Sequence, residues 1–297
     1  MRSNDTIALS SQIMKFVTFR NSTDQPEVGV LDGANIYSLA GAGILDMTQL
    51  AALGAAGAVK KATAAIAAKA AKVPAKQTKL MAPVLNPSKI LCVGLNYRDH
   101  AIESNMAIPK FPTIFSKFNN TIIGQGDTIV LPKQSTQPDY EAEMAVVIGV
   151  GGKHIAARSW KKHVFGYMNL HDVSARDLQL CTTQWLMGKS PDTFAPCGPW
   201  IVSADEIADP HNLNIKITVS GEVLQKSNTK HLIFDIPKLI SYISSVMTLQ
   251  PGDIISTGTP AGVGFARKPP RLLRDGDVCI VEVQGLGKLE NPVALEK

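Results

Sequence analysis

The feature that most constrains this chain is residues 138–150, PDYEAEMAVVIGV, where an acidic segment runs directly into an apolar one. The apolar half is rich in valine and isoleucine and predicts a buried strand. Asp139, Glu141 and Glu143 stand at alternate positions, and residues two apart in a strand point to the same face. Crowded carboxylates repel one another and are costly to bury unless they are paired or bound to a cation. The segment therefore predicts a charged site at the edge of a core.

The pattern of predicted secondary structure changes near Pro83. Before it, MKFVTFR and VGVLDGANIYSLA indicate a short hairpin, and alanine-rich helical stretches follow from about residue 45 to 72. After it, short β-like runs such as ILCVG, MAVVIGV and VFGYMNL are separated by turn residues. We predict an α+β protein with a small N-terminal α+β domain (1–82) and a larger domain (83–297) with a barrel- or sandwich-like β core. Residues 1–13 read as a disordered extension before the first strand.

Two further polar groups follow strand-like runs. In HDVSARDLQL, Asp172, Arg176 and Gln179 would share one face of a helix if the segment is helical. By itself, the segment is better explained by an N-cap aspartate and a solvated helix face. In RDHAIESNM, His100 and Glu103 stand three residues apart. That spacing suits a carboxylate that orients an imidazole as a general base, and it equally suits a surface ion pair.

Glycine-rich turns carry weaker signals. The segment PGDIISTGTPAGVG misses the spacing of a dinucleotide-binding loop, and GKSPD lacks the upstream glycines of a phosphate loop. We therefore exclude nucleotide binding. The turn that holds Thr259 suits a small anionic ligand. Lys189 lies in a loop with prolines and glycines, where a lone lysine is usually exposed to solvent.

The carboxylates indicate a site for a hard divalent cation. Carboxylates on one strand, with Asp172 after a neighbouring strand, form an all-oxygen site that suits Mg²⁺, and Mn²⁺ or Ca²⁺ also fits by ligand type. The cluster has neither histidine nor cysteine, which disfavours zinc.

Composition narrows the partners. The tract 59–79 has six lysines and no acidic residue, but it has no aromatic or arginine residue either, so a solvated surface helix is favoured over a nucleic-acid arm. No apolar run reaches the roughly 18 residues of a membrane helix. The four cysteines form no CxxC pair, and no secretory signal is evident. These features predict an intracellular, cytoplasmic protein that binds neither membranes nor nucleic acid.

Taken in order, YEAEMAVVIG, HDVSARDLQ, GKSPDTFAPCGP, GEVLQKSNT and GDIISTGTPAGVG resemble the fumarylacetoacetate hydrolase family. The similarity runs from about Lys89 to the C-terminus, and residues 1–82 are more loosely similar to the appended domain of that family. The resemblance implies a mixed β-roll fold, a homodimer and a magnesium or manganese ion.

The resemblance also implies roles for single residues. Glu141, Glu143 and Asp172 match the metal ligands, whereas Asp139 matches none. A further aspartate ligand of the founding hydrolase has no clear counterpart. The remaining matches are Lys189 as an active-site lysine, His100 and Glu103 as a water-activating dyad on a mobile lid, and Arg176, Gln179 and Thr259 as substrate contacts.

These roles imply a metal-dependent hydrolase that cleaves a C–C bond in a 2,4-dioxo acid such as an acylpyruvate. An oxaloacetate tautomerase or decarboxylase on the same site is the alternative activity. Two further classes of protein stay open. A metal-binding protein without catalysis is one, and an intact His100–Glu103 pair argues against it. A nucleic-acid binder is the second, and its affinity would fall steeply with salt.

Overall fold

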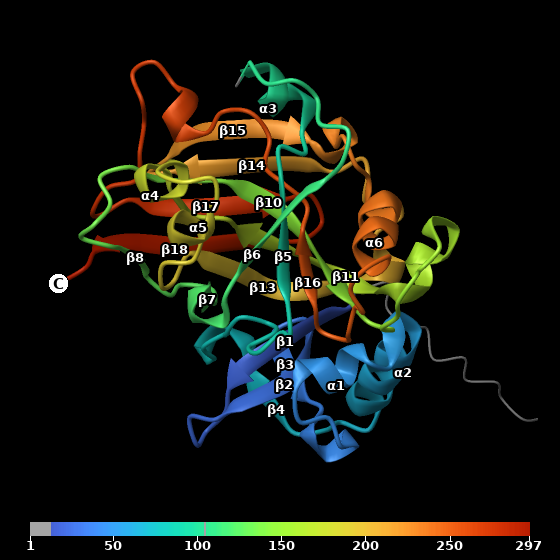
Figure 1. Cartoon of the computed structure of the whole chain (residues 1–297). Coiled ribbons are helices and arrows are strands. Elements are labelled where there is room, and N and C mark those ends of the chain that lie inside the picture. Colours follow the sequence, from blue (N-terminus) through green and yellow to red (C-terminus); the bar gives the residue numbers. More distant parts are fainter. Residues whose placement is uncertain (1–12, 104) are drawn as a thin grey trace, which may run out of the picture.

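A computed structural model describes residues 13–103 and 105–297 (Figure 1). The helices are α1 (Met47–Ala51), α2 (Gly54–Ala67), α3 (Arg98–Glu103), α4 (Arg176–Leu180), α5 (Leu186–Lys189) and α6 (Ile236–Ser244). The first strands are β1 (Lys15–Arg20), β2 (Pro26–Asp32), β3 (Asn35–Ser38), β4 (Lys72–Pro74), β5 (Ile90–Gly94), β6 (Thr113–Lys117), β7 (Ile122–Ile123), β8 (Ile129–Leu131) and β9 (Pro138–Asp139). The later strands are β10 (Ala142–Ile148), β11 (Val164–His171), β12 (Ser174–Ala175), β13 (Ala195–Ser203), β14 (Asn214–Val219), β15 (Glu222–Asn228), β16 (Ile254–Ser256), β17 (Val278–Val283) and β18 (Lys288–Leu295).

Most strands belong to one large mixed sheet of order β4-β3-β2-β1-β13-β11-β10-β16-β5-β6, with β7 paired to β13. A second sheet of order β15-β14-β17-β18-β8 packs against it, and buried side chains such as Val146, Tyr167 and Ile217 belong to the core between them. The protein is therefore α+β and dominated by sheets, as predicted. The strands of the described residues form no closed barrel.

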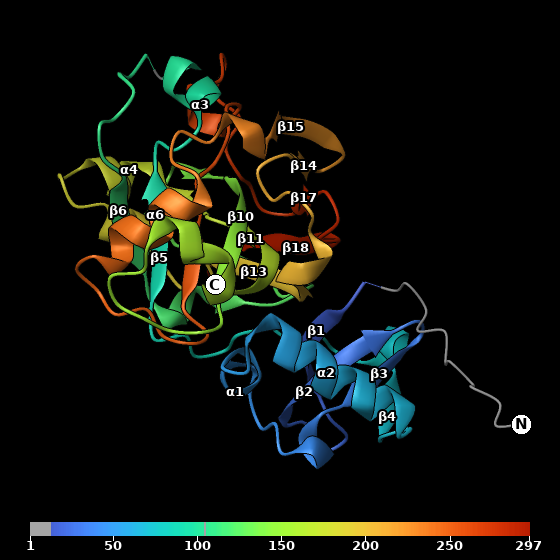
Figure 2. The same cartoon turned by 90° about the vertical axis from the view of Figure 1, so that its right-hand side faces the viewer.

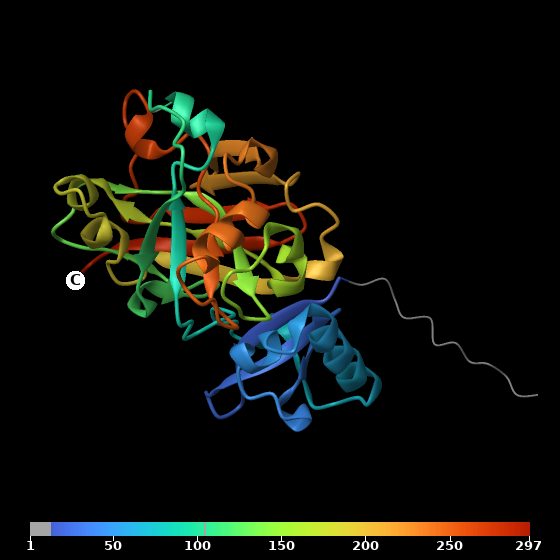
Figure 3. The same cartoon turned by 45° about the vertical axis from the view of Figure 1, so that its right-hand side comes forward.

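The N-terminal part, residues 13–82, joins the large sheet through a single strand pair. β1 pairs antiparallel with β13, with Phe16 opposite Ile201. Helices α1 and α2 cover one face of β1–β3, on the side toward the viewer in Figure 2. Figure 3 shows this part beneath the remainder of the molecule. The two parts also share a hydrophobic core, in which Phe16 stacks on Phe165 at 5.1 Å between ring centroids. The division at residues 82/83 into two domains therefore stays a prediction.

The lysine-rich tract is helical only in its first half. Helix α2 ends at Ala67 and buries Ala58, Ala62 and Ala65, whereas all six lysines of the tract are exposed. Their exposure is that expected of a solvated surface. The predicted disordered extension, residues 1–13, lies outside the described range except for Ile13. In that range, no helix is long and apolar enough to cross a membrane.

Residues 138–148 fold as two strands rather than one. β9 pairs with β12, whereas β10 lies between β11 and β16 in the large sheet. All seven residues of β10 are buried, as predicted. Tyr140 and Glu141 connect the two strands, so the three carboxylates do not lie on one continuous strand.

Candidate active site

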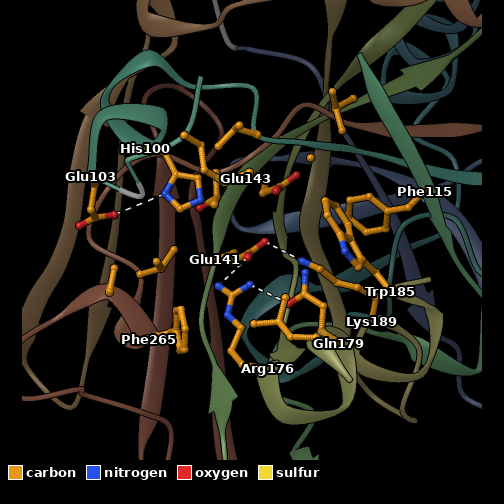
Figure 4. Close-up of a pocket in the computed structure, with 18 residues that line it drawn as sticks. His100, Glu103, Phe115, Glu141, Glu143, Arg176, Gln179, Trp185, Lys189 and Phe265 are labelled. Atoms are coloured by element: carbon orange, nitrogen blue, oxygen red, sulfur yellow. Dashed lines mark hydrogen bonds and ion pairs between the residues drawn. The ribbon is translucent and has the colours of Figure 1, made fainter. Parts of the chain in front are cut away.

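The site is a pocket of about 480 Å³ between α3, α4, α5, the end of β5 and the segment 259–266 (Figure 4). Every predicted site residue except Asp172 lines it, and Asp172 lies against this lining in the acid cluster described next. The predicted residues that line the pocket are His100, Glu103, Glu141, Glu143, Arg176, Gln179, Lys189 and Thr259.

Glu141, Glu143 and Asp172 form the acid cluster, in which one carboxylate oxygen of each residue lies within 4.8 Å of the others. Glu143 is in β10, and Asp172 directly follows β11, which pairs with β10 with Ala142 opposite His171. The backbone N–H of Asp172 also donates to the carbonyl of Glu141 at 3.0 Å. Strand pairing therefore brings together carboxylates that lie about 30 residues apart in the chain.

Two members of the acid cluster have cationic partners. Lys189 Nζ lies 2.8 Å from both Glu141 Oε2 and Asp172 Oδ2, and Lys117 forms a buried ion pair with Asp172. Arg176 lies 2.7 Å from Glu141 Oε1. Burial alone would raise the pKa of Glu141, but Lys189 and Arg176 outweigh burial and hold it well below its usual range.

Glu143 has neutral partners. Its carboxylate accepts hydrogen bonds from the hydroxyl of Ser256 and from the backbone N–H of Gly258, the latter at 2.9 Å. Burial, together with the nearby charges of Asp172 and Glu141, raises the pKa of Glu143. Glu143 is thus the member of the acid cluster that most lacks a counterion.

The charges at the buried end of the pocket fit a divalent cation. The acid cluster and the adjacent Asp139 together contain four carboxylates. Among the described residues, three cationic side chains form ion pairs with them: Lys117, Arg176 and Lys189. His171 adds no positive charge, because burial and then Lys117 lower its pKa to about 3. With all of these groups ionised, one negative charge remains in excess, which a cation or a proton on Glu143 would balance. Oxygen donors are those that Mg²⁺ and Mn²⁺ prefer. The acid cluster therefore fits a hard divalent cation.

Asp139 has a different role from the acid cluster. Its Oδ2 accepts from Arg176 Nε at 2.8 Å and from the N–H of Phe265 at 3.1 Å, and its Oδ1 accepts from the N–H of Gly264 at 2.7 Å and of Tyr140 at 2.8 Å. Asp139 therefore ties Arg176 to the turn that carries Phe265.

Helix α4 is shorter than the predicted helical face. It begins at Arg176, with Ala175 as its N-cap residue, so Asp172 is neither on the helix nor its cap. The reason is that Ser174 and Ala175 pair with β9 as a short strand. Arg176 Nη1 donates to Gln179 Oε1 at 2.9 Å, which places these two predicted substrate contacts together on the pocket wall.

His100 and Glu103 lie on α3, as predicted, and Figure 4 shows the imidazole on the side of the pocket that faces Glu141 and Glu143. His100 Nδ1 is 3.4 Å from Glu103 Oε2, and Glu103 also accepts from the N–H of Gly262 at 2.9 Å. Burial would raise the pKa of Glu103, but the hydrogen bonds from His100 and Gly262 outweigh it and lower the pKa. An ionised Glu103 keeps Nδ1 of His100 as the protonated nitrogen.

The glycine turn binds carboxylates of the protein itself. Gly258, with φ +100°, is required because a Cβ there would lie 2.8 Å from Asn96 Cβ, and its N–H donates to Glu143. The Thr259 hydroxyl donates to the carbonyl of Ala142 at 3.0 Å. Thr259 lines the pocket, but this bond secures the acidic strand, and its contact with substrate stays a prediction.

Lys117 is a site residue that the sequence analysis missed. It is fully buried at the end of β6, where it donates to Asp172 and, at 2.9 Å, to the carbonyl of Val173. The strand-like run TIFSK could have indicated it, because residues two apart in a strand share a face, so Lys117 lies on the same face as Phe115. Phe115 lines the pocket. The aromatic walls formed by Trp185 and Phe265 were missed as well.

Comparison with known proteins identifies the family. The family model described as fumarylacetoacetate (FAA) hydrolase C-terminal matches residues 89–294, which include the acid cluster, the dyad and Lys189. The chain belongs to the fumarylacetoacetate hydrolase family. It is therefore related to enzymes, and the resemblance seen in its motifs is confirmed.

Characterised relatives of this family member are oxaloacetate tautomerases. The rat (Rattus norvegicus) mitochondrial oxaloacetate tautomerase Fahd2a is 50% identical over 237 residues, which cover 80% of this chain and 76% of the relative. The human (Homo sapiens) mitochondrial oxaloacetate tautomerase FAHD2A is 49% identical over 231 residues, which cover 77% and 74%. These names agree with the alternative activity better than with the hydrolase.

Solved structures of the family agree with the fold. The fumarylacetoacetate hydrolase of the psychrophile Exiguobacterium antarcticum has a TM-score of 0.84 at 35% identity, covering 95% of this chain and 100% of that one. Maleylpyruvate hydrolase from Sphingobium sp. SYK-6, in complex with manganese(II) and pyruvate, has a TM-score of 0.81 at 32% identity, covering 96% and 100%.

One prediction is wrong by the same comparison. The chain was expected to be cytoplasmic, but the rat and human relatives are mitochondrial proteins. The expectation had rested on composition, which does not determine the compartment of a protein within the cell. All four cysteines are free. The homodimer stays a prediction.

Proposed function

We propose that this protein is a Mg²⁺- or Mn²⁺-dependent oxaloacetate tautomerase, which interconverts the enol and keto forms of the acid. The observation that carries the proposal is a histidine–carboxylate pair facing a buried anionic cluster in one pocket. The choice of substrate is supported by the names of relatives that are 50% and 49% identical in sequence to this chain.

The basic and amide side chains would bind and orient the acid. Arg176 and Gln179 are held together on α4 and line the pocket beside Glu141. Lys189 presents a buried ammonium group, whose pKa burial would lower but Asp172 and Glu141 raise, so it stays charged. These groups suit a carboxylate and a 2-oxo oxygen. A divalent cation held by Glu141, Glu143 and Asp172 would supply Lewis-acid stabilisation of an enolate oxygen.

The proton transfer is assigned to the dyad. In ketonisation, the enol hydroxyl loses its proton to solvent and C3 gains one; the reverse reaction removes a proton from C3. With Nδ1–H directed to Glu103, His100 Nε2 is the atom that holds or delivers the proton at C3. Glu103, fixed by the N–H of Gly262, keeps the imidazole in this orientation.

Hydrolysis of a 2,4-dioxo acid is the second candidate, because the same dyad could deprotonate a water molecule. The similarity to maleylpyruvate hydrolase favours it. Decarboxylation of oxaloacetate would need the stabilised enolate but not the dyad.

The decisive test is His100→Ala assayed on two reactions with Mg²⁺ present. If the dyad moves the proton, decay of the enol absorbance of oxaloacetate should slow by about 10²-fold, the usual scale for a general acid–base group. Pyruvate release from oxaloacetate should change much less. The matched control is His154→Ala, which changes an exposed histidine that does not line the pocket. Undiminished enol decay in His100→Ala, or full activity after exhaustive chelation, would reject the proposal.

A further inference from the structure

The turn formed by residues 262–265 is held by a side chain that is neither a proposed metal ligand nor part of the dyad. The hydroxyl of Tyr140 donates to the carbonyl of Gly262 at 3.1 Å. Tyr140 is fully buried and directly precedes Glu141 in the chain. Burial, followed by the charge of Asp139, raises the pKa of Tyr140, so the hydroxyl keeps the proton that it donates. A rigid, buried side chain therefore fixes the carbonyl side of Gly262.

Gly262 is also the contact between this turn and the dyad. Its N–H donates to Oε1 and Oε2 of Glu103, at 2.9 and 3.0 Å. Among the described residues, this N–H and Nδ1 of His100 are the hydrogen-bond partners of the Glu103 carboxylate. Glycine is required here, because φ is +100° and a Cβ would collide with the carbonyl oxygen of Leu224. A displacement of Gly262 would therefore move Glu103, and with it the imidazole.

Helix α3 is anchored more firmly at its beginning than at its end. Arg98 Nη1 donates to the carbonyl of Leu232 at 3.0 Å, and Asp99 Oδ2 accepts from the hydroxyl of Ser227 at 2.5 Å. These two residues begin the helix, whereas Glu103 ends it. The orientation of the dyad at the end of α3 therefore depends on its contact with the turn.

Two further side chains hold the turn, and neither replaces Tyr140. Arg267 Nε donates to the same carbonyl of Gly262, but at 3.3 Å and from a partly exposed side chain. Asp139 accepts from the two N–H groups at the far end of the turn. The Tyr140 hydroxyl is thus the short, buried contact at the residue that binds Glu103.

We infer that Tyr140 is a positioning residue for the dyad. Its hydroxyl holds Gly262, which holds Glu103, which in turn orients His100 for proton transfer at C3. Because Tyr140 is the chain neighbour of Glu141, one segment sets the position of both the acid cluster and the dyad. Such placement matters, since a misplacement of about 1 Å can cost about 10²-fold in rate. The inference rests on the proposed function, because it takes the dyad as the group that moves the proton.

Tyr140→Phe tests the inference, because it removes the hydroxyl and keeps the buried ring. With Mg²⁺ present, kcat for enol decay of oxaloacetate should fall about three- to tenfold, the scale of one neutral hydrogen bond. KM should stay within about twofold, because the residues assigned to substrate binding are unchanged. Pyruvate release and Mn²⁺ affinity should also stay as in the wild type, whereas a general loss of structure would reduce both.

The matched control is Tyr97→Phe. Tyr97 is also fully buried, but its hydroxyl has no hydrogen-bond partner among the described residues, so this variant should keep the wild-type kcat. A double-mutant cycle tests the route through Glu103. In a Glu103→Ala background, Tyr140→Phe should lower kcat by less than about twofold, because the carboxylate that the turn holds is absent.

A measurement without substrate follows the imidazole itself. The Mg²⁺-loaded protein is labelled with ¹⁵N-histidine, and comparison with His100→Ala assigns the signals of His100. The bond to Glu103 favours the tautomer with the proton on Nδ1. Tyr140→Phe should shift the ¹⁵N signals away from this tautomer, in the direction that Glu103→Ala produces. Tyr97→Phe should leave them unchanged.

The outcomes distinguish this inference from the proposed function. If His100→Ala slows enol decay but Tyr140→Phe changes neither kcat nor the His100 signals, the inference is wrong and the proposed function stands. An equal loss of kcat from Tyr140→Phe with and without the Glu103 carboxylate, or from Tyr97→Phe, would also overturn it. If the wild type does not tautomerise oxaloacetate, the proposed function fails, and the His100 signals then decide by themselves whether Tyr140 positions the dyad.

Discussion

Asp139 and Glu143 lie four residues apart and are both buried, but their surroundings differ. Asp139 accepts a hydrogen bond from the Arg176 guanidinium and three more from backbone N–H groups. Glu143 accepts one from a hydroxyl and one from a backbone N–H. The protein therefore neutralises Asp139 by itself, whereas the charge of Glu143 is left to a ligand.

The difference separates a carboxylate that serves structure from one that serves binding. A buried carboxylate with an opposite charge and a full set of hydrogen bonds is a fixed part of the fold. A buried carboxylate beside Asp172 and Glu141 is poised for a divalent cation, because binding removes the repulsion among all three. Glycine, serine and backbone groups keep Glu143 in place without competing for that role.

The largest expected effect is that of Glu143→Gln. Mutation of residues behind metal ligands already reduces affinity or activity 10–100-fold, so loss of a ligand should reduce Mn²⁺ affinity and turnover by more than about 10². Thermal unfolding in EDTA should show stability equal to or above that of the wild type, since a neutral amide replaces a buried carboxyl group whose charged form is disfavoured by burial and by Asp172 and Glu141. Mg²⁺ at 100 times its dissociation constant should stabilise the wild type by about 2.7 kcal/mol, but not the variant.

Glu222→Gln is the matched control for that experiment, because Glu222 is exposed on β15 and does not line the pocket. It should leave metal binding and stability unchanged. If Glu143→Gln bound Mn²⁺ as the wild type does, Glu143 would not be a ligand and the contrast with Asp139 would fail.

Asp139→Asn should show the opposite pattern. It leaves the Arg176 guanidinium buried with one carboxylate fewer, and breaking a buried pair in this way typically costs about 3–5 kcal/mol of unfolding free energy. Mn²⁺ should still bind, because Asp139 is not in the acid cluster. The measurements are denaturant unfolding in EDTA and calorimetric titration with Mn²⁺. A stable variant that had lost its metal affinity would show that Asp139 belongs to the metal site.

The residues proposed for the site lie together in the fold, and their roles stay predictions. Glu141, Glu143, His100 and Lys189 line one pocket with Asp172 beside it, and the apolar run after Glu143 is a buried strand. These residues could be proposed from the sequence because a motif resemblance identifies positions in the chain without any knowledge of their three-dimensional contacts. The carboxylates proposed as metal ligands were indicated even before the resemblance, by like charges too close together to be left unbalanced.

What the sequence could not show depended on long-range pairing. The helix predicted from Asp172 gives way to a strand at Ser174 because β9 is there to pair with it. The pattern of TIFSK could place Lys117 on the same strand face as Phe115, but it could not show that β6 brings Lys117 against Asp172, 55 residues away. The apolar residues of the pocket wall, such as Leu180 on α4 and Phe265 in the 263–266 turn, likewise come from segments that no local pattern links.

The smallest expected effect concerns Asp277, a carboxylate that is paired with an arginine as Asp139 is, but lies nearer the surface. Asp277 forms a two-pronged pair with Arg271, at 2.8 and 3.0 Å, and accepts from the Ser220 hydroxyl at 2.6 Å. Burial would raise the pKa of Asp277, but the hydrogen bonds from Arg271 and Ser220 outweigh it and lower the pKa. A carboxyl group whose pKa is lower in the folded than in the unfolded state stabilises the fold above the unfolded pKa. This contribution is lost as the pH falls through the folded value.

Asp277→Asn should therefore lower the unfolding free energy at pH 7 by about 1 kcal/mol, because the pair is partly screened by solvent. The midpoint of thermal unfolding should fall by about 2–4 °C. Below about pH 4, the ordinary range of an aspartate, the wild type should approach the variant as its own Asp277 is protonated. Melting curves of both proteins across pH 3–8 in EDTA measure this difference without contribution from the metal site. A gap between the two proteins that stayed constant down to pH 3 would mean that the charge of Asp277 contributes nothing, and that neutralisation by the protein stabilises only fully buried carboxylates such as Asp139.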